Sequence, residues 1–232
     1  MDDITLISDP RVRSIPILEC NEELVDVKDF PEFIISSKRV GIYEGFTFLR
    51  KSVARKLKEA ATLLPKGIRI IFEEGHRPLS VQTKIFKDYY AELKEKHPNW
   101  DHEKTHIECT KYIAAPVGNP PHSTGGVFDI SLAGENQREL DMGSSSDDTP
   151  DENGDRNFSY SKNISEKAKD NRANLIYVME KIGFVNYPTE WWHWSYGDQY
   201  WAYIKKQDHA IYGLKEMPNL KVDLSISYRK IK

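Results

Sequence analysis

Hydrophobic residues recur along the chain at two spacings, which divide it into helical and extended segments. Three segments carry apolar residues at the spacing of a helix, with Val53 and Leu57 in the first, Val81, Ile85, Tyr89 and Leu93 in the second, and Leu175 and Met179 in the third. Each segment follows a residue suited to an N-cap, namely Thr47, Ser80 and Ser165. Apolar or alternating runs predict strands at 68–72, 127–132, 184–194 and 220–228. Because the two kinds of element are interspersed along the chain, the sequence predicts an α+β fold.

The composition is that of a globular protein that does not act through a basic surface. Of 232 residues, 39% are hydrophobic and 30% are charged, and the formal net charge is -3, which argues against binding of nucleic acid. No apolar stretch is long enough to span a bilayer, and the N-terminal segment carries acids where a signal peptide requires bases. We expect a single domain over residues 1–232 that binds neither nucleic acid nor membrane. It is expected in the cytoplasm, or in the periplasm if a signal peptide has been removed.

Two features of the chain leave alternatives open. Residues 134–165 are acidic and rich in Ser, Asp, Asn and Gly, which predicts either a loop beside a site or a flexible insertion. Cys20 and Cys109 lie outside any CxxC pair. They could form one disulfide, but two separate thiols fit a reducing compartment better.

The stretch 120–132 places a histidine and a carboxylate where a metal would fit. Its sequence is PPHSTGGVFDISL, in which His122 precedes a double-glycine turn and Asp129 lies within the apolar strand that follows. Alternation along that strand directs Asp129 to the face opposite Phe128 and Ile130. A carboxylate in so apolar a strand costs free energy unless it is paired or bound to a metal. The stretch therefore indicates two ligands of a metal site.

The remaining groups of such a site are found in two other segments. Residues 189–194, TEWWHW, offer His193 as a third ligand, with Glu190 three residues earlier in what we expect to be a turn. Two imidazoles and one carboxylate suit zinc and leave its fourth position for a water molecule, whose pKa the metal lowers. Glu190 can take the proton of that water. Arg77, held in the turn EGHRP after a predicted strand, would neutralise the oxyanion of a tetrahedral intermediate.

The motifs EGHRP, HSTGGVFD and EWWH, in this order, resemble those of the D-alanyl-D-alanine dipeptidases, zinc peptidases of the vancomycin-resistance type. The pattern of that family is a Ser-x-His-x-x-Gly-x-Ala-x-Asp run followed much later by Glu-x-x-His. The resemblance implies one zinc ion per chain, bound by His122, Asp129 and His193. It also implies that Glu190 is the catalytic base and that Arg77 stabilises the transition state. We expect a compact domain whose central, mostly antiparallel sheet is flanked by helices and carries the zinc site.

Two positions depart from the family pattern, and a further position is assigned through it. Pro120 stands where the family has a serine beside the substrate, and Val127 stands where it has alanine, so substrate preference is expected to differ more than zinc binding. The segment LDMG followed by Asp147 is similar to the family segment whose carboxylate receives the free amino group of the substrate. The adjacent Asp148 is the alternative to Asp147 at this position.

Simpler interpretations stand beside these assignments. His122 and Asp129 could form a buried hydrogen-bonded pair without a metal, and Arg77 could pair with Glu73 or Glu74 at the surface. A competing zinc motif is also present, because residues 102–106, HEKTH, match HExxH. Its central and flanking residues are polar, which predicts a solvated helix or loop rather than the buried helix of that peptidase class.

The sequence favours an enzyme that hydrolyses D-alanyl-D-alanine, or a similar D,D-dipeptide, to free amino acids. The expected partner is a small dipeptide. The alternative is a D,D-carboxypeptidase or peptidoglycan endopeptidase of the related zinc family, although such proteins usually carry an export signal or a wall-binding module. A non-catalytic zinc-binding module is least favoured, because both Glu190 and Arg77 are present.

Overall fold

A central sheet of five strands organises the described part of the chain, which a computed structural model gives as residues 4–146, 148, 154–217 and 219–225. In spatial order the strands are β2 (Phe33–Ile35), β4 (Arg69–Glu74), β5 (Val127–Ala133), β7 (Glu190–Ser195) and β6 (Val185–Tyr187). β2 runs parallel to β4, and every other neighbouring pair is antiparallel. The prediction of an α+β fold with a mostly antiparallel sheet is confirmed.

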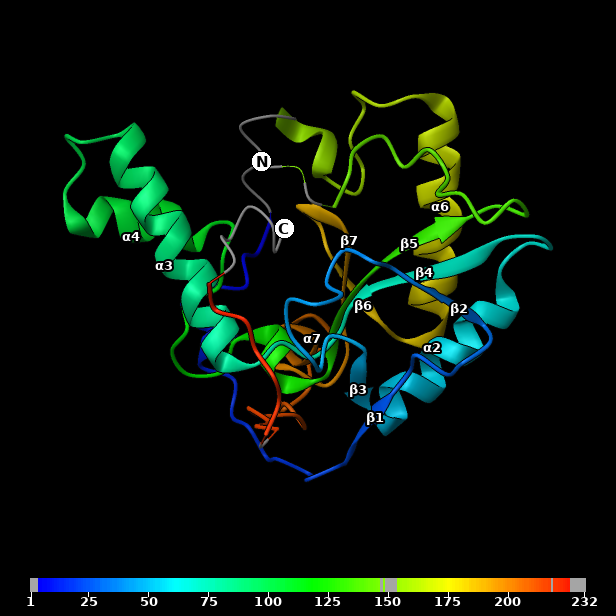
Figure 1. Cartoon of the computed structure of the whole chain (residues 1–232), viewed down its shortest axis with the longest axis horizontal. Helices are drawn as coiled ribbons and strands as arrows, with labels where there is room; N and C mark the ends of the chain where they lie inside the picture. Colours follow the sequence, from blue (N-terminus) through cyan, green and yellow to red (C-terminus); the bar gives the residue numbers. More distant parts are fainter. Residues whose placement is uncertain (1–3, 147, 149–153, 218, 226–232) are drawn as a thin grey trace.

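Two long helices pack together beside the sheet and enclose the main core. α2 (Lys51–Leu63) and α6 (Glu166–Ile182) lie in the right half of Figure 1, where they overlap the strands in the view. They contribute the apolar side chains that the helical spacing identified, including Val53, Leu57, Leu175 and Met179. Phe128, Ile130 and Leu132 of β5 join the same core, so Asp129 projects from the other face of the strand, as the alternation predicts.

A helical hairpin forms a second hydrophobic cluster away from the sheet. α3 (Leu79–Lys96) and α4 (His102–Thr110) pack against each other at the left of Figure 1. The residues that the spacing placed on one face of α3 are all buried, namely Val81, Ile85, Tyr89 and Leu93. A third small cluster joins α1 (Pro10–Arg13) and α7 (Gln199–Ile204) to β6.

One of the three predicted N-caps is confirmed and two are wrong. The Ser165 side chain accepts a hydrogen bond from the Ala168 amide at the start of α6. Thr47 instead precedes the short strand β3 (Phe48–Arg50), which pairs with β1 (Leu24–Asp26), so α2 begins only at Lys51. α3 begins at Leu79 with Pro78 before it, which leaves Ser80 inside its first turn.

The strand predictions hold for the centre of the sheet and change at its edges. The segment 184–194 contains two strands rather than one, because a turn at 188–189 separates β6 from β7. The strand predicted at 220–228 is reduced, within the described residues, to a single β-bridge between Val222 and Tyr43. Ile226 and Tyr228 lie outside the described residues.

Cys20 is exposed and Cys109 is buried, and both are free thiols. Among the described helices, none combines the length and the apolar character needed to cross a membrane.

Candidate metal centre

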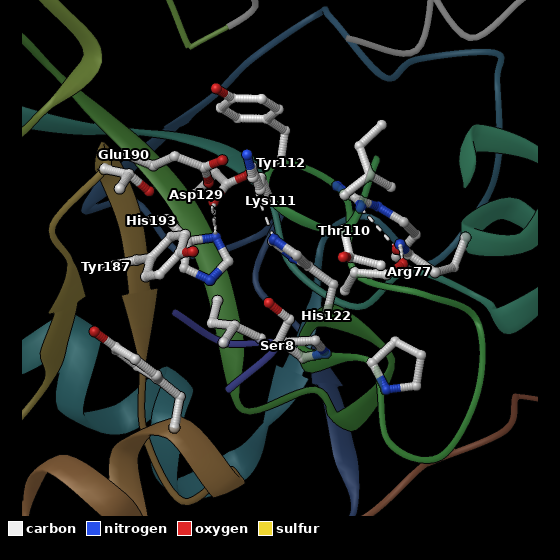
Figure 2. Close-up of a pocket in the computed structure, with 18 of the residues that line it drawn as sticks. Ser8, Arg77, Thr110, Lys111, Tyr112, His122, Asp129, Tyr187, Glu190 and His193 are labelled. Carbon is white, nitrogen blue, oxygen red and sulfur yellow. Dashed lines mark hydrogen bonds and ion pairs between the residues drawn. The ribbon is translucent and has the colours of Figure 1, made fainter. Parts of the chain in front are cut away.

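Three predicted ligands meet where β5, β7 and a short 3-10 helix come together. Asp129 and His193 are paired across the two strands, with 3.1 Å between His193 Nδ1 and Asp129 Oδ1. His122 projects from η1 (Pro121–Thr124), and its Nε2 lies 3.5 Å from Asp129 Oδ2. Within the described part of the chain, these side chains are the one group of three whose ligand atoms all lie within 4.8 Å of one another. Figure 2 shows both imidazoles directed toward the carboxylate.

Glycine makes the turn that carries His122 possible. Gly125 ends η1 in the left-handed conformation with φ of 72°, and a Cβ there would lie 2.3 Å from Leu24 Cδ2. At Gly126 a Cβ would lie 2.4 Å from the carbonyl oxygen of Tyr196. A larger residue at Gly126 would therefore push the turn away from the backbone at Tyr196, and one at Gly125 would strain the backbone and displace the Leu24 side chain.

Backbone contacts fix the orientation of the His122 ring. Its Nδ1 lies 2.9 Å from the carbonyl oxygen of Gly75, so Nδ1–H donates to that oxygen and Nε2 is directed to Asp129. The Arg77 amide donates to the His122 carbonyl at 3.2 Å, and the Ser123 hydroxyl donates to the Arg77 carbonyl at 2.8 Å. The loop after β4 and the ligand-bearing helix are thus bonded to each other.

The electrostatics of the three side chains favour an ionised carboxylate. Burial alone would raise the pKa of Asp129, but attraction to His122 and hydrogen bonding to the two histidines hold it well below its usual range. Burial lowers the pKa of His193, and hydrogen bonding to Asp129 reverses that effect and raises it. His193 Nε2 is buried without a hydrogen bond in the described structure. A buried anion facing two imidazoles fits a divalent cation such as zinc.

Glu190 lies beside this group at the start of β7. Its Oε2 is 3.6 Å from His193 Nδ1, and both residues line the same cavity. Residues three apart on a regular strand point to opposite faces. An irregularity in the pairing of β6 with β7, where Tyr187 lies opposite Glu190, accounts for their shared orientation. The turn expected between Glu190 and His193 is therefore wrong, because both residues lie in β7, and the turn falls at 188–189, just before Glu190.

Arg77 lines the same cavity on the opposite side of His122 from His193 (Figure 2). Its Nε donates to Glu74 Oε1, and its Nη1 donates to Gln82 Oε1 at 2.8 Å. Burial would lower the pKa of Arg77, but the charge of Glu74 and the hydrogen bond to it raise it. Arg77 does pair with Glu74, as the simpler interpretation proposed, yet Glu74 is fully buried, so the pair is not at the surface.

The cavity between these groups has a volume of about 150 Å³. Its wall includes Tyr187, whose ring meets the His193 ring edge-on at 5.8 Å, and Pro120 at the position where the family pattern has serine. Asp147 lies outside the described residues. Its neighbour Asp148 lines the cavity and accepts a hydrogen bond from the Ser145 amide at 2.8 Å.

The sequence did not single out Gln82 or Tyr187, and it placed Glu74 at the surface rather than in the interior. Glu74 lies in a pair of consecutive acids at a strand end, a pattern that is usually solvated. Only its packing against distant residues shows that it is buried. A carboxylate three residues before Arg77 was the one local signal for the pairing.

The competing HExxH motif lies on α4, away from the cavity. His102 is exposed, and its ring stacks on that of His106 at 6.2 Å. Neither histidine belongs to a group of three potential ligands within the described residues. The helix is polar and largely solvated, as its composition predicts, so the structure gives no support to a zincin site.

A family model and the curated relatives of this chain agree on one family. A family model described as D-ala-D-ala dipeptidase matches residues 36–211, which include every candidate site residue. A D-alanyl-D-alanine dipeptidase of Synechocystis sp. is 30% identical over 231 residues, covering 84% of this chain and 90% of that protein. One of Enterococcus faecalis is 31% identical over 156 residues, covering 64% of this chain and 73% of that protein. The solved structure "VanYB in complex with D-Alanine-D-Alanine" has a TM-score of 0.45 and 16% identity, covering 81% of this chain and 85% of that one.

Proposed function

The chain belongs to the D-alanyl-D-alanine dipeptidase family, and from that premise we propose that it hydrolyses D-alanyl-D-alanine or a similar D,D-dipeptide. One zinc ion would be held by His122, Asp129 and His193. The observation that carries the proposal is the convergence of these three side chains with Glu190 and Arg77 on one cavity. A non-catalytic module would need neither of the last two residues there.

Each residue has a role that its position supports. When bound, zinc lowers the pKa of a coordinated water and polarises the scissile carbonyl. Glu190, beside His193, takes the proton of the attacking water and delivers it to the leaving amine. Arg77 carries a fixed positive charge at the other end of the cavity, where it offsets the charge that develops on the carbonyl oxygen. The tryptophans of β7 are buried and help to exclude water from the site.

A dipeptidase must bind both termini of its short substrate in one pocket. The free amino group of such a substrate requires an acid, and Asp147 is our choice for it, with the cavity-lining Asp148 as the alternative. Pro120 offers no hydroxyl to the substrate, so preference among dipeptides is expected to differ from that of relatives with serine. Action in the cytoplasm remains a prediction from the acidic N-terminal segment.

A substrate panel tests this proposal. The zinc-loaded protein is incubated with D-Ala-D-Ala, L-Ala-L-Ala and a stem pentapeptide ending in D-Ala-D-Ala, and the release of amine is followed with and without a zinc chelator. We expect chelator-sensitive turnover of the D,D-dipeptide alone. Preferential cleavage of the pentapeptide would favour the carboxypeptidase alternative, and no turnover of any D-containing dipeptide would contradict the proposal.

A further inference from the structure

We propose that Glu74 is a positioning residue for catalysis, whose buried carboxylate holds the guanidinium of Arg77 toward the cavity. The inference rests on the proposed function, because it assigns Glu74 a role through Arg77. Glu74 lies at the end of β4, does not line the cavity and would not contact substrate. Its effect on the reaction would therefore be indirect.

Three donors from different segments converge on this carboxylate. Arg77 Nε and the Tyr43 hydroxyl donate to Oε1, and Arg39 Nε donates to Oε2 at 3.0 Å. Glu74 is fully buried, and so large a set of donors offsets the cost of burying a charge. Although burial would raise the pKa of Glu74, the charges of Arg77 and Arg39 lower it, so it is ionised at neutral pH.

The hydrogen bonds that Arg77 donates determine which of its guanidinium nitrogens is left to face the substrate. Glu74 holds Nε, and Gln82 holds Nη1 while its own amide donates to the Ala114 carbonyl at 2.7 Å. A guanidinium group is planar, so fixing two of its nitrogens fixes the third. Nη2 is the nitrogen that these two bonds leave for an oxyanion. A donor oriented before substrate binds needs no reorganisation during the reaction.

The strand end that carries Glu74 also orients a zinc ligand. Glu74 is paired with Asp129 across β4 and β5, and the next residue, Gly75, supplies the carbonyl that holds His122. Gly75 is itself crowded, since a Cβ there would lie 2.5 Å from the Phe48 carbonyl oxygen. The same rigid turn thus sets the relative position of the cation and the metal ligand. Glu74 pairs with Arg39 as well as with Arg77, so its negative charge is divided between two guanidinium groups. It therefore orients Arg77 but offsets only part of the positive charge of Arg77.

A double-mutant cycle tests the proposal on the full-length, zinc-loaded protein. In the Glu74→Gln variant we expect kcat for D-Ala-D-Ala to fall roughly 10- to 100-fold, less than the loss of an oxyanion donor itself. KM and bound zinc should change little. In an Arg77→Ala background the same substitution should cause no further loss of kcat, because the group that Glu74 positions is absent. Equal losses in both backgrounds would overturn the proposal.

Two further variants keep the test decisive. If Glu74→Gln does not fold, Glu74→Asp retains the charge but shortens the side chain, and the same cycle applies to it. Glu32→Gln is the matched control, since Glu32 pairs with Lys58 at 2.9 Å, away from the cavity, and its kcat should be that of the wild type. A wild-type protein without dipeptidase activity, or an Arg77→Ala variant with undiminished kcat, would instead refute the proposed function. An active wild type, an impaired Arg77→Ala variant and additive losses would refute only the role of Glu74.

Discussion

His193 lies directly opposite Asp129 on the neighbouring antiparallel strand, with 3.1 Å between His193 Nδ1 and Asp129 Oδ1. Strand pairing alone therefore sets two proposed ligands at a fixed separation, and His122 approaches the same carboxylate from a 3-10 helix. The paired strands form a rigid base for a metal ion, whereas the third ligand depends on a glycine turn.

The first prediction concerns the metal. His122→Ala and His193→Ala should each lose the bound zinc, because two protein ligands bind the ion far more weakly than three. Bound zinc is measured by elemental analysis of the purified variants. His102→Ala and His106→Ala, in the competing motif on α4, are the matched controls and should retain one zinc per chain. If only the His102→Ala and His106→Ala variants lost zinc, the metal site would be the HExxH motif on α4.

The second prediction concerns Glu190. Glu190→Gln keeps the shape of the side chain but cannot accept a proton, so kcat for D-Ala-D-Ala should fall about 10²- to 10⁴-fold. Zinc content should be unchanged, since Glu190 is not one of the proposed ligands. Steady-state kinetics and metal analysis on the same preparation separate the two effects. A variant with normal kcat would show that another group takes the proton.

The third prediction concerns the shape of the cation at position 77. Arg77→Lys retains the positive charge, but a single ammonium group cannot hold Glu74 and Gln82 and also face the cavity. We expect kcat to fall about 10²-fold, as for the loss of one oxyanion donor, with a smaller change in KM. Comparable kcat values for lysine and arginine would show that charge alone is required.

A local sequence pattern predicted the face of β5 on which Asp129 lies, because strand alternation is a short-range signal. The alternation of β5 separated Asp129 from the core residues Phe128 and Ile130, and the structure confirms that separation. Pairing of β5 with β7 is a different matter. It joins Asp129 to His193 across a long loop and a helix, and no local pattern specifies which strands become neighbours.

Residues whose role depends on distant contacts could not be identified in this way. Glu74 is buried because Arg39 and Tyr43 cover it, and both lie more than thirty residues earlier in the chain. Thr47 failed as an N-cap for a similar reason, since its carbonyl accepts a hydrogen bond from the Val27 amide and leads into a strand. Tertiary contacts outweighed local preference at both places.

The fourth prediction concerns acid stability. His76 is buried, and burial lowers its pKa from the ordinary value of 6.5 to about 4. As the pH falls below 6.5, the unfolded chain takes up a proton that the folded chain does not bind until about pH 4. The contribution of neutral His76 to the free energy of unfolding is therefore full above pH 6.5 and decreases as the pH falls from 6.5 to about 4. At pH 5 the decrease is about 2 kcal/mol.

Urea unfolding of wild type and His76→Gln at pH 7 and pH 5 measures this contribution. The loss of stability between the two pH values should be about 2 kcal/mol smaller in the variant than in the wild type. An equal pH dependence in His76→Gln and wild type would contradict the assignment.

The last prediction separates backbone strain from steric overlap in the turn that carries His122. Gly125 and Gly183 both adopt positive φ, of 72° and 96°. A Cβ at Gly183 meets nothing within 4 Å, whereas one at Gly125 lies 2.3 Å from Leu24 Cδ2. Gly183→Ala should therefore cost only the backbone term of about 1 kcal/mol. Gly125→Ala should cost about 1 kcal/mol more, because the Leu24 side chain must also change position. Thermal unfolding of the two variants compares these costs, and equal costs would show that Leu24 accommodates the added methyl group.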